Sequence, residues 1–216
     1  MIDVTLIHGE CLEQMRSMNA GMFDFCFTDV PYNVSKDYGE YKDNLSDDDY
    51  LEWSGKVIAE IKRVSKFSCI FVPTKYIREY WWMLGSDYKQ IVLSYGPTGA
   101  IRWGYSNQFS TLLTNTKPNK IIKNVWHNCQ MTGLGYFFKE NNYGHPGYTS
   151  EDITGRVVES FTLQGQSVID PFSGTGTTGV ECVKRDRKYT GIEQELKWFE
   201  LSEKRIHDAQ QQMRLF

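Results

Sequence analysis

Four consecutive residues at the end of an apolar run have side chains that could do chemistry. The run from Phe23 to Thr28 is rich in β-forming residues, which predicts a buried strand, and Asp29-Val30-Pro31-Tyr32 follow it. The aspartate can accept hydrogen bonds, the proline fixes its φ angle and stiffens the turn, and the tyrosine ring can stack. Such a group at the carboxyl end of a strand indicates an active site, with an ordinary turn as the alternative.

A second segment, SVIDPFSGTGTTGVECVKR, places a glycine-rich turn between a predicted strand and a predicted helix. Gly174, Gly176 and Gly179 give the spacing G-x-G-x-x-G, and Glu193 follows 14 residues later at the end of the next predicted strand, KYTGIE. Glycines allow positive φ angles and a close approach of the backbone to a ligand, and a carboxylate at a strand end suits ribose hydroxyl groups. This pattern alone is compatible with a nicotinamide-dependent dehydrogenase.

Two features count against a dehydrogenase. Only 23 residues follow Glu193, too few for a second nucleotide-binding half. The turn is also preceded by Asp170-Pro171-Phe172, and a carboxylate there would repel a pyrophosphate but could bind a cationic amine. S-adenosylmethionine has an α-amino group, a sulfonium and an adenosine but no phosphate, so we expect it to be the ligand of this turn.

The composition is that of one globular domain. The chain has 216 residues, 40% hydrophobic and 24% charged, and a net charge of only -3, so any nucleic-acid interface must be a local basic patch. None of the five cysteines forms a CxxC pair, which predicts buried free thiols rather than a zinc site or a disulfide framework. No signal peptide and no apolar run of the roughly 18 residues that a membrane helix needs is visible. We therefore expect a cytoplasmic protein with no metal and no membrane association.

Strand and helix patterns alternate along the chain. The expected strands span residues 4–8, 23–28, 68–72, 88–96, 109–115, 167–169 and 187–193. The expected helices span residues 10–18, 46–64, 76–84, 149–161 and 194–212, and a polar loop covers 33–44. This alternation predicts a mostly parallel α/β sheet.

Several segments together resemble the amino-group (N6-adenine or N4-cytosine) DNA methyltransferases of the β, or permuted, motif order. TDVPY resembles their catalytic (D/N/S)PP(Y/F) motif, which in that order precedes a cofactor motif, DPFxGxGTT, resembled here by DPFSGTGTTG. IHGECLEQM, STLLTNTKP and HPGYTSEDITGRVVESFT resemble further family segments, so the resemblance covers nearly the whole chain. It implies a single catalytic domain over residues 1–216, with a Rossmann-like methyltransferase fold: a mostly parallel twisted sheet with helices on both faces.

The resemblance also implies roles for individual residues. Asp29 and the backbone carbonyl of Val30 would accept both hydrogens of an exocyclic amine, and Tyr32 would stack on a base flipped out of double-stranded DNA. For every acid in the set the alternative is a helix cap or a solvated turn. Residues expected around S-adenosylmethionine are Glu10, Cys11, Asp29, Asp170, Phe172, Gly174, Gly176, Thr177, Thr178 and Glu193.

The chain departs from the family pattern at three of these motifs. Val30 stands where proline is usual, but a backbone carbonyl is all that the position contributes. Glu10 replaces an aspartate, and Thr149 stands at the lysine of the HPxxKP segment, which leaves open how the carboxylate of the cofactor is held. We expect His145 to be structural, and Thr149 and Ser150 to cap the following helix.

An aspartate in the catalytic motif favours N6-adenine over N4-cytosine as the target. Two further hypotheses are a degenerate methyltransferase that only binds DNA or a partner, and an enzyme that acts on RNA. The recognition insertion, about residues 117–144, is short, which predicts a short target sequence, a homodimer or a separate specificity subunit. Residues expected to contact DNA are Lys36, Tyr38, Tyr41, Lys117, Lys120 and Lys123.

Overall fold

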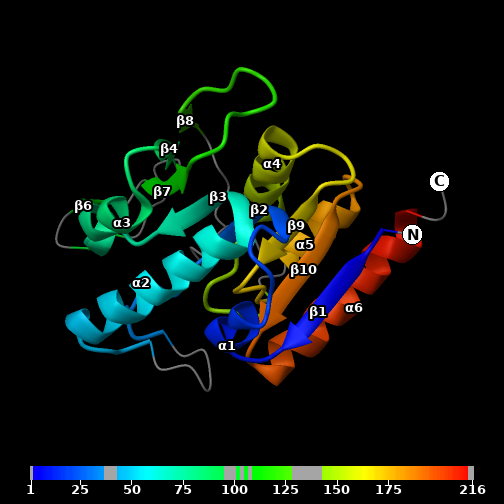
Figure 1. The fold of residues 1–216 in the computed structure, drawn as a ribbon, viewed down its shortest axis with the longest axis horizontal. Helices are drawn as coiled ribbons and strands as arrows, with labels where there is room; N and C mark the ends of the chain where they lie inside the picture. Colours follow the sequence, from blue (N-terminus) through cyan, green and yellow to red (C-terminus); the bar gives the residue numbers. More distant parts are fainter. Residues whose placement is uncertain are drawn as a thin grey trace.

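The computed structural model describes residues 2–36, 43–94, 101–102, 105–106, 109–127 and 143–213. An eight-stranded sheet forms the centre of the molecule (Figure 1), in the order β1-β10-β9-β2-β3-β7-β4-β8. Its strands are β1 (Val4–His8), β2 (Phe23–Asp29), β3 (Ser65–Val72), β4 (Lys89–Ser94), β7 (Phe109–Thr114), β8 (Val125–Trp126), β9 (Ser167–Asp170) and β10 (Lys188–Glu193). A separate pair consists of β5 (Ile101–Arg102) and β6 (Tyr105–Ser106).

The predicted, mostly parallel α/β sheet is confirmed. The five strands β1, β10, β9, β2 and β3 run parallel to one another. β7 runs antiparallel to both β3 and β4, and β8 is parallel to β4. The carboxyl ends of β1, β10, β9 and β2 therefore lie along one edge of the sheet, where Asp29, Asp170 and Glu193 end their strands.

Helices cover both faces of the sheet because alternate residues of each buried strand point to opposite sides. Phe25 and Phe27 of β2 belong to the core that packs against α4 (Glu151–Phe161), α5 (Thr177–Val183) and α6 (Leu196–Met213). Cys26 of the same strand belongs to the core under α1 (Cys11–Arg16), α2 (Asp47–Val64) and α3 (Ile77–Leu84), which a short 3-10 turn, η1 (Thr74–Tyr76), precedes. Figure 1 shows these two helical layers on either side of the strands.

Polar side chains begin the helices as the sequence predicted. The Ser46 hydroxyl accepts from the Asp49 amide at the start of α2, and Ser150 accepts from the Ile153 amide at the start of α4. Most boundaries lie within two residues of the expected ones, and the largest difference is at β3, which begins at Ser65 rather than at residue 68 because Ser65 is both the C-cap of α2 and the first residue of the strand.

Further predictions concern cysteines, metals and membranes. Cys11, Cys26, Cys69 and Cys182 are buried free thiols, as predicted, whereas Cys129 lies outside the described residues. Across the described ranges, no cluster of His, Cys, Asp and Glu side chains could hold a metal ion. No helix in this part of the chain is both long and apolar enough to span a bilayer.

Candidate active site

Asp29, the last residue of β2, presents one anchored and one unanchored carboxylate oxygen. Its Oδ2 accepts a hydrogen bond from the Thr149 hydroxyl at 3.0 Å. Its Oδ1 is buried and has no hydrogen-bond partner among the described residues. Burial raises the pKa of Asp29 to about 6. Hydrogen bonds from the side chains of Tyr32 and Thr149 and the positive charge of Lys36 act in the opposite direction and lower it. An unpartnered buried carboxylate oxygen is costly for folding, so its retention here points to an external hydrogen-bond donor.

The turn after Asp29 is fixed from behind by a buried tyrosine. The Tyr50 hydroxyl of α2 donates to the carbonyl of Pro31 at 2.7 Å and lies 3.0 Å from the Tyr80 hydroxyl of α3. This bond fixes the peptide plane that follows Pro31, and the proline ring fixes the φ angle between that plane and the one that carries the Val30 carbonyl. Tyr50 carries no motif around it, and the sequence offered no signal for this role.

The loop beyond Tyr32 is organised by a buried acid that the sequence did not single out. The carboxylate of Asp43 accepts from the backbone amides of Asn33, Val34 and Lys36 at 2.7, 3.0 and 3.0 Å. Asn33 and Ser35 have φ angles of 54° and 61°, which non-glycine residues rarely adopt. The Asp43 carboxylate offsets that strain and supports the conformation of the turn after Asp29.

Asp170, at the end of β9, is buried and fully engaged. Its Oδ1 accepts from the Thr28 hydroxyl at 2.8 Å and from the Phe172 amide at 3.1 Å, and its Oδ2 accepts from the Thr178 hydroxyl at 2.6 Å. Burial raises the pKa of Asp170 to about 6. The side chain thus ties the glycine-rich turn to β2, one residue before Asp29.

Glu193, at the end of β10, holds the other side of the same turn. Its two carboxylate oxygens accept from the Gly174 and Glu195 amides, each at 2.8 Å, and burial raises its pKa. His145 packs against the turn, because a Cβ atom on Gly174 would lie 3.3 Å from its Nε2. Burial lowers the pKa of His145 to about 4, and its ring packs edge-on against Trp198, in keeping with the expected structural role.

Two glycines of this segment lie against α6, where a side chain would not fit. Gly176 has a φ angle of 79°, and a Cβ atom on it would lie 2.8 Å from Cβ of Ser202 on α6. A Cβ atom on Gly179 would lie 2.3 Å from Cδ1 of Ile206 on the same helix. Both glycines therefore permit close packing of α5 against α6, a purpose that the sequence pattern does not distinguish from approach to a ligand.

The remaining residues expected at the cofactor also have internal partners. Glu10 is the N-cap of α1 and accepts from the Glu13 amide at 2.8 Å and from the Cys11 thiol at 3.2 Å. Phe172 packs edge-on against Trp53 of α2. Glu10 thus caps a helix, which was the alternative for this acid. A contact of Glu10 or Cys11 with a cofactor stays a prediction.

The carboxylates at this edge of the sheet suit S-adenosylmethionine as a ligand. Asp170 and Glu193 hold the turn, and the one cation shown to contact residues 174–178 of the described structure, Arg205, is already engaged by Thr175, Thr177 and Glu151. The acids fit a cationic ligand with ribose hydroxyl groups, and the unpartnered Oδ1 of Asp29 lies on the neighbouring strand.

The described residues expected to contact DNA do not form one group: Lys120 and Lys123 line one cavity, and Lys36 lies elsewhere. Lys36 lies near the catalytic turn, with its Nζ 5.9 Å from the centre of the Tyr32 ring. Lys117 follows the antiparallel β7 and so lies toward the amino ends of the parallel strands, where the Asn115 amide donates to the Ser68 carbonyl. Lys120 pairs with Glu159 near the end of α4, remote from its start beside Asp29. Tyr38 and Tyr41 lie outside the described residues.

Lys123 lies beside a basic cavity at the β8 edge of the sheet. The cavity has a volume of about 330 Å³, and its charged lining consists of Lys120, Lys123 and Arg156 with the one acid Glu159. The Arg156 guanidinium lies over the Trp126 ring at 4.4 Å. Most of the predicted recognition insertion, residues 128–142, lies outside the described residues.

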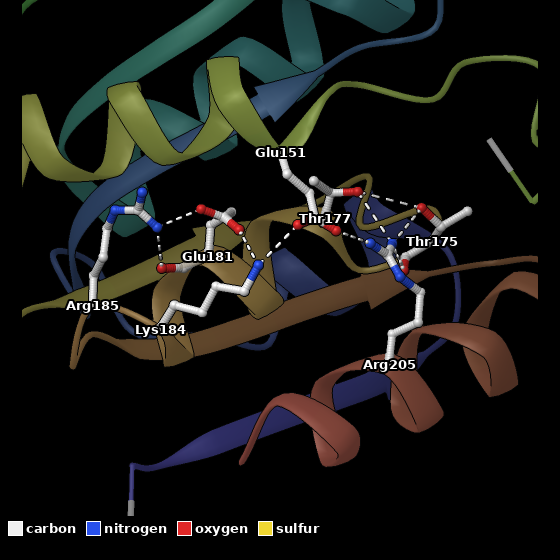
Figure 2. Close-up of polar contacts among 7 residues, drawn as sticks. All are labelled: Glu151, Thr175, Thr177, Glu181, Lys184, Arg185 and Arg205. Carbon is white, nitrogen blue, oxygen red and sulfur yellow. Dashed lines mark hydrogen bonds and ion pairs between the residues drawn. The ribbon is translucent and has the colours of Figure 1, made fainter. Parts of the chain in front are cut away.

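Arg205 of α6 joins the glycine-rich turn to the segment that follows the recognition insertion (Figure 2). Its Nη1 donates to the Thr175 carbonyl at 2.6 Å and to the hydroxyls of Thr175 and Thr177, and its Nη2 pairs with Glu151 at 2.9 Å. Its guanidinium also lies 4.5 Å from the centre of the Tyr143 ring. Beside it, Glu181 of α5 pairs with Lys184 and Arg185.

Replacing Arg205 by methionine should lower the free energy of unfolding by about 3 kcal/mol, since it removes the buried donor to the Thr175 carbonyl and to the Thr175 and Thr177 hydroxyls, and one of the two cations that pair with Glu151. Urea denaturation measures this loss. Lys204→Met, which removes only an exposed pair with Asp208, should change stability by less than about 0.5 kcal/mol. Equal losses in the two variants would show that the buried contacts of Arg205 are not stabilising.

Comparisons with known proteins agree with this geometry. A family model described as DNA methylase matches residues 23–120 and 87–204, which together span most of the chain. The chain belongs to the N6/N4 DNA methylase family. The predicted resemblance is therefore confirmed.

Individual DNA methyltransferases match nearly the whole length of the chain. The DNA adenine methyltransferase YhdJ of Escherichia coli (strain K12) is 23% identical over 248 residues, covering 95% of this chain and 83% of that protein. The solved PvuII DNA methyltransferase, which is cytosine-N4-specific, superposes with a TM-score of 0.72 at 15% identity, covering 98% and 92% of the two chains. A complex of M1.HpyAVI with SAM superposes with a TM-score of 0.66 at 21% identity, covering 94% and 99%. These structures confirm the methyltransferase fold.

Proposed function

We propose that this methylase transfers a methyl group from S-adenosylmethionine to the exocyclic N6 of adenine in double-stranded DNA. The observation that carries the proposal is the buried, unpartnered Oδ1 of Asp29, placed beside a fixed Val30–Pro31 turn and next to the glycine-rich turn. Two acceptors at this place match the two hydrogens of an amine. The solved SAM complex of the similar fold supports the cofactor assignment.

The residues of the chain activate the amine by accepting its hydrogens. The lone pair of an exocyclic amine is delocalised into the base, and hydrogen bonds to Asp29 Oδ1 and the Val30 carbonyl make the nitrogen more tetrahedral and more nucleophilic. Tyr32 stacks on the flipped base and orients it. The cofactor, held at the glycine-rich turn that Asp170 and Glu193 support, would supply an electrophilic methyl group to the amine nitrogen, and the electron pair of the C–S bond would remain on sulfur. The amine then loses one proton, for which Asp29 is the neighbouring base.

Adenine is the proposed target because the catalytic motif begins with aspartate, and the relative YhdJ is named as an adenine methyltransferase. Nucleoside analysis of DNA methylated by the purified protein tests the assignment. N6-methyladenine is the expected product. N4-methylcytosine alone would leave the mechanism in place and overturn the assignment of adenine as the target base. Methyl label found in RNA and not in DNA would overturn the assignment of DNA as the substrate.

We propose further that DNA approaches the carboxyl edge of the sheet, where Lys36 contacts a backbone phosphate. Lys36→Gln should weaken duplex binding about fivefold at low salt and reduce the slope of log K against log salt by about one. Lys66→Gln is the matched control, since Lys66 lies near the amino end of β3, at the opposite edge of the sheet, and binding should not change. A larger loss of affinity for Lys66→Gln than for Lys36→Gln would mean that DNA binds at the amino edge of the sheet.

The recognition insertion at about residues 117–144 remains part of the proposal, with Lys123 as a DNA contact beside the basic cavity. Its short length still predicts a short target sequence, a homodimer or a separate specificity subunit. Sedimentation of the protein with and without a duplex distinguishes the first two, because only a dimer doubles the mass bound per site.

A further inference from the structure

Thr149 makes a contact that its place in the sequence does not suggest. It stands at the lysine of the HPxxKP segment, 120 residues from Asp29, and its hydroxyl donates to Asp29 Oδ2 at 3.0 Å. The expectation that Thr149 helps to cap α4 is not met, because Ser150 is the N-cap and accepts from the Ile153 amide. The Thr149 hydroxyl is therefore directed at the catalytic carboxylate rather than at the helix.

The contact gives the two carboxylate oxygens of Asp29 different roles. A carboxylate can rotate about its Cβ–Cγ bond, and an anchored oxygen restricts that rotation. Because Oδ2 is held by Thr149, Oδ1 is the oxygen that remains for an incoming donor. Next to the proposed second acceptor, the Val30 carbonyl, the Tyr50 hydroxyl bonds the carbonyl of Pro31.

We propose that Thr149 is a positioning residue for methyl transfer: its hydroxyl anchors Oδ2 of Asp29, so that Oδ1 faces the amine of the target base. This inference rests on the proposed function and deepens it, by assigning a role to a residue at which the chain departs from the family pattern. It also links the segment that follows the recognition insertion to the catalytic acid, because Thr149 lies only a few residues after that insertion.

The hydrogen bond also stabilises the ionised form of Asp29, which is the form that accepts the amine hydrogens. Burial raises the pKa of Asp29 to about 6, and removal of the Thr149 donor should raise it further. The acid limb of the rate profile should then move to higher pH. The titratable and charged groups around Asp29 that also act on this profile are Tyr32, Lys36, Asp170 and Tyr80.

The test compares Thr149→Val, which keeps the shape and removes the hydroxyl, with Thr149→Ser, which keeps the hydroxyl. For Thr149→Val we expect kcat at pH 7 to fall about tenfold, with KM for S-adenosylmethionine within about twofold, and the acid limb to rise by about one pH unit. Thr149→Ser should restore most of the lost rate and return the acid limb to its place. A role in folding alone would not shift the pH profile.

A second measurement does not depend on turnover. The pKa of Asp29 can be followed by ¹³C NMR of protein labelled at the aspartate carboxyl carbon, with the signal assigned by its loss in Asp29→Asn. We expect a higher pKa in Thr149→Val and an unchanged pKa in Thr149→Ser. An unchanged pKa together with an unchanged kcat in the valine variant would overturn the role of Thr149. A wild type that transfers no methyl group would overturn the proposed function instead, and the NMR titration would still decide the anchoring contact.

Discussion

Replacing Asp29 by asparagine should lower kcat for methyl transfer by about 10³-fold, because the amide cannot present a charged acceptor at Oδ1. The affinity for S-adenosylmethionine should change little, since the glycine-rich turn is held by Asp170 and Glu193 rather than by Asp29. Label transfer to DNA and calorimetric binding of the cofactor separate the two effects. An equal loss of binding and turnover would show that Asp29 supports the cofactor rather than the chemistry.

The same variant should be at least as stable as the wild type at pH 7. The pKa of Asp29 is raised to about 6 in the folded protein, above its value in the unfolded chain, so the folded state binds the proton more tightly. The stability contributed by the protonated form is present at low pH and is lost as the pH rises from about 4 to about 6. Asparagine cannot ionise and escapes this loss. Melting temperatures across that range check the sign: a variant less stable than wild type above pH 6 would contradict it.

Gly176→Ala should lower the free energy of unfolding by about 3 kcal/mol, the sum of a left-handed backbone strain and a steric clash. The clash arises because the new Cβ would lie 2.8 Å from Cβ and 3.0 Å from Cα of Ser202, and the latter atom belongs to the backbone of α6. Cofactor binding should fall as well, because Gly176 begins α5 directly after the turn.

Gly165→Ala is the matched control for this substitution. Gly165 has a nearly equal φ angle of 80°, but a Cβ atom there would meet nothing within 4 Å. It should cost only the backbone strain, about 1 kcal/mol, and leave cofactor binding intact. Urea denaturation of both variants isolates the steric contribution. If the two variants lost the same stability, α5 and α6 would not be closely packed through Gly176.

Patterns of short range predicted most of the fold. Period-two and continuous apolar runs located β2 and β9, and the Ser46 and Ser150 caps marked the starts of α2 and α4, because these signals depend only on neighbouring residues. The direction of β7 could not be inferred in this way. Since β7 is antiparallel, Lys117 lies toward the edge opposite the catalytic turn, whereas position in the sequence alone suggested contact with DNA.

The site was predicted as a set of residues but not as a set of contacts. The sequence identified Asp29, Asp170 and Glu193, which end three adjacent strands of the sheet. The contacts around Asp29 come from distant segments: Thr149 stands where the family motif has lysine, Tyr50 lies in no motif, and only the folded structure reveals what their hydroxyls bond. Glu10 caps α1, the alternative that the sequence left open for it, and its contact with the cofactor stays a prediction.

The most direct test of the proposed function is methyl transfer from labelled S-adenosylmethionine to unmethylated genomic DNA by the purified protein. We expect label in DNA that accumulates with time and saturates when all target sites are modified. Cofactor binding without any label in DNA would contradict the proposal, and would mean that the unpartnered oxygen of Asp29 does not meet a DNA base.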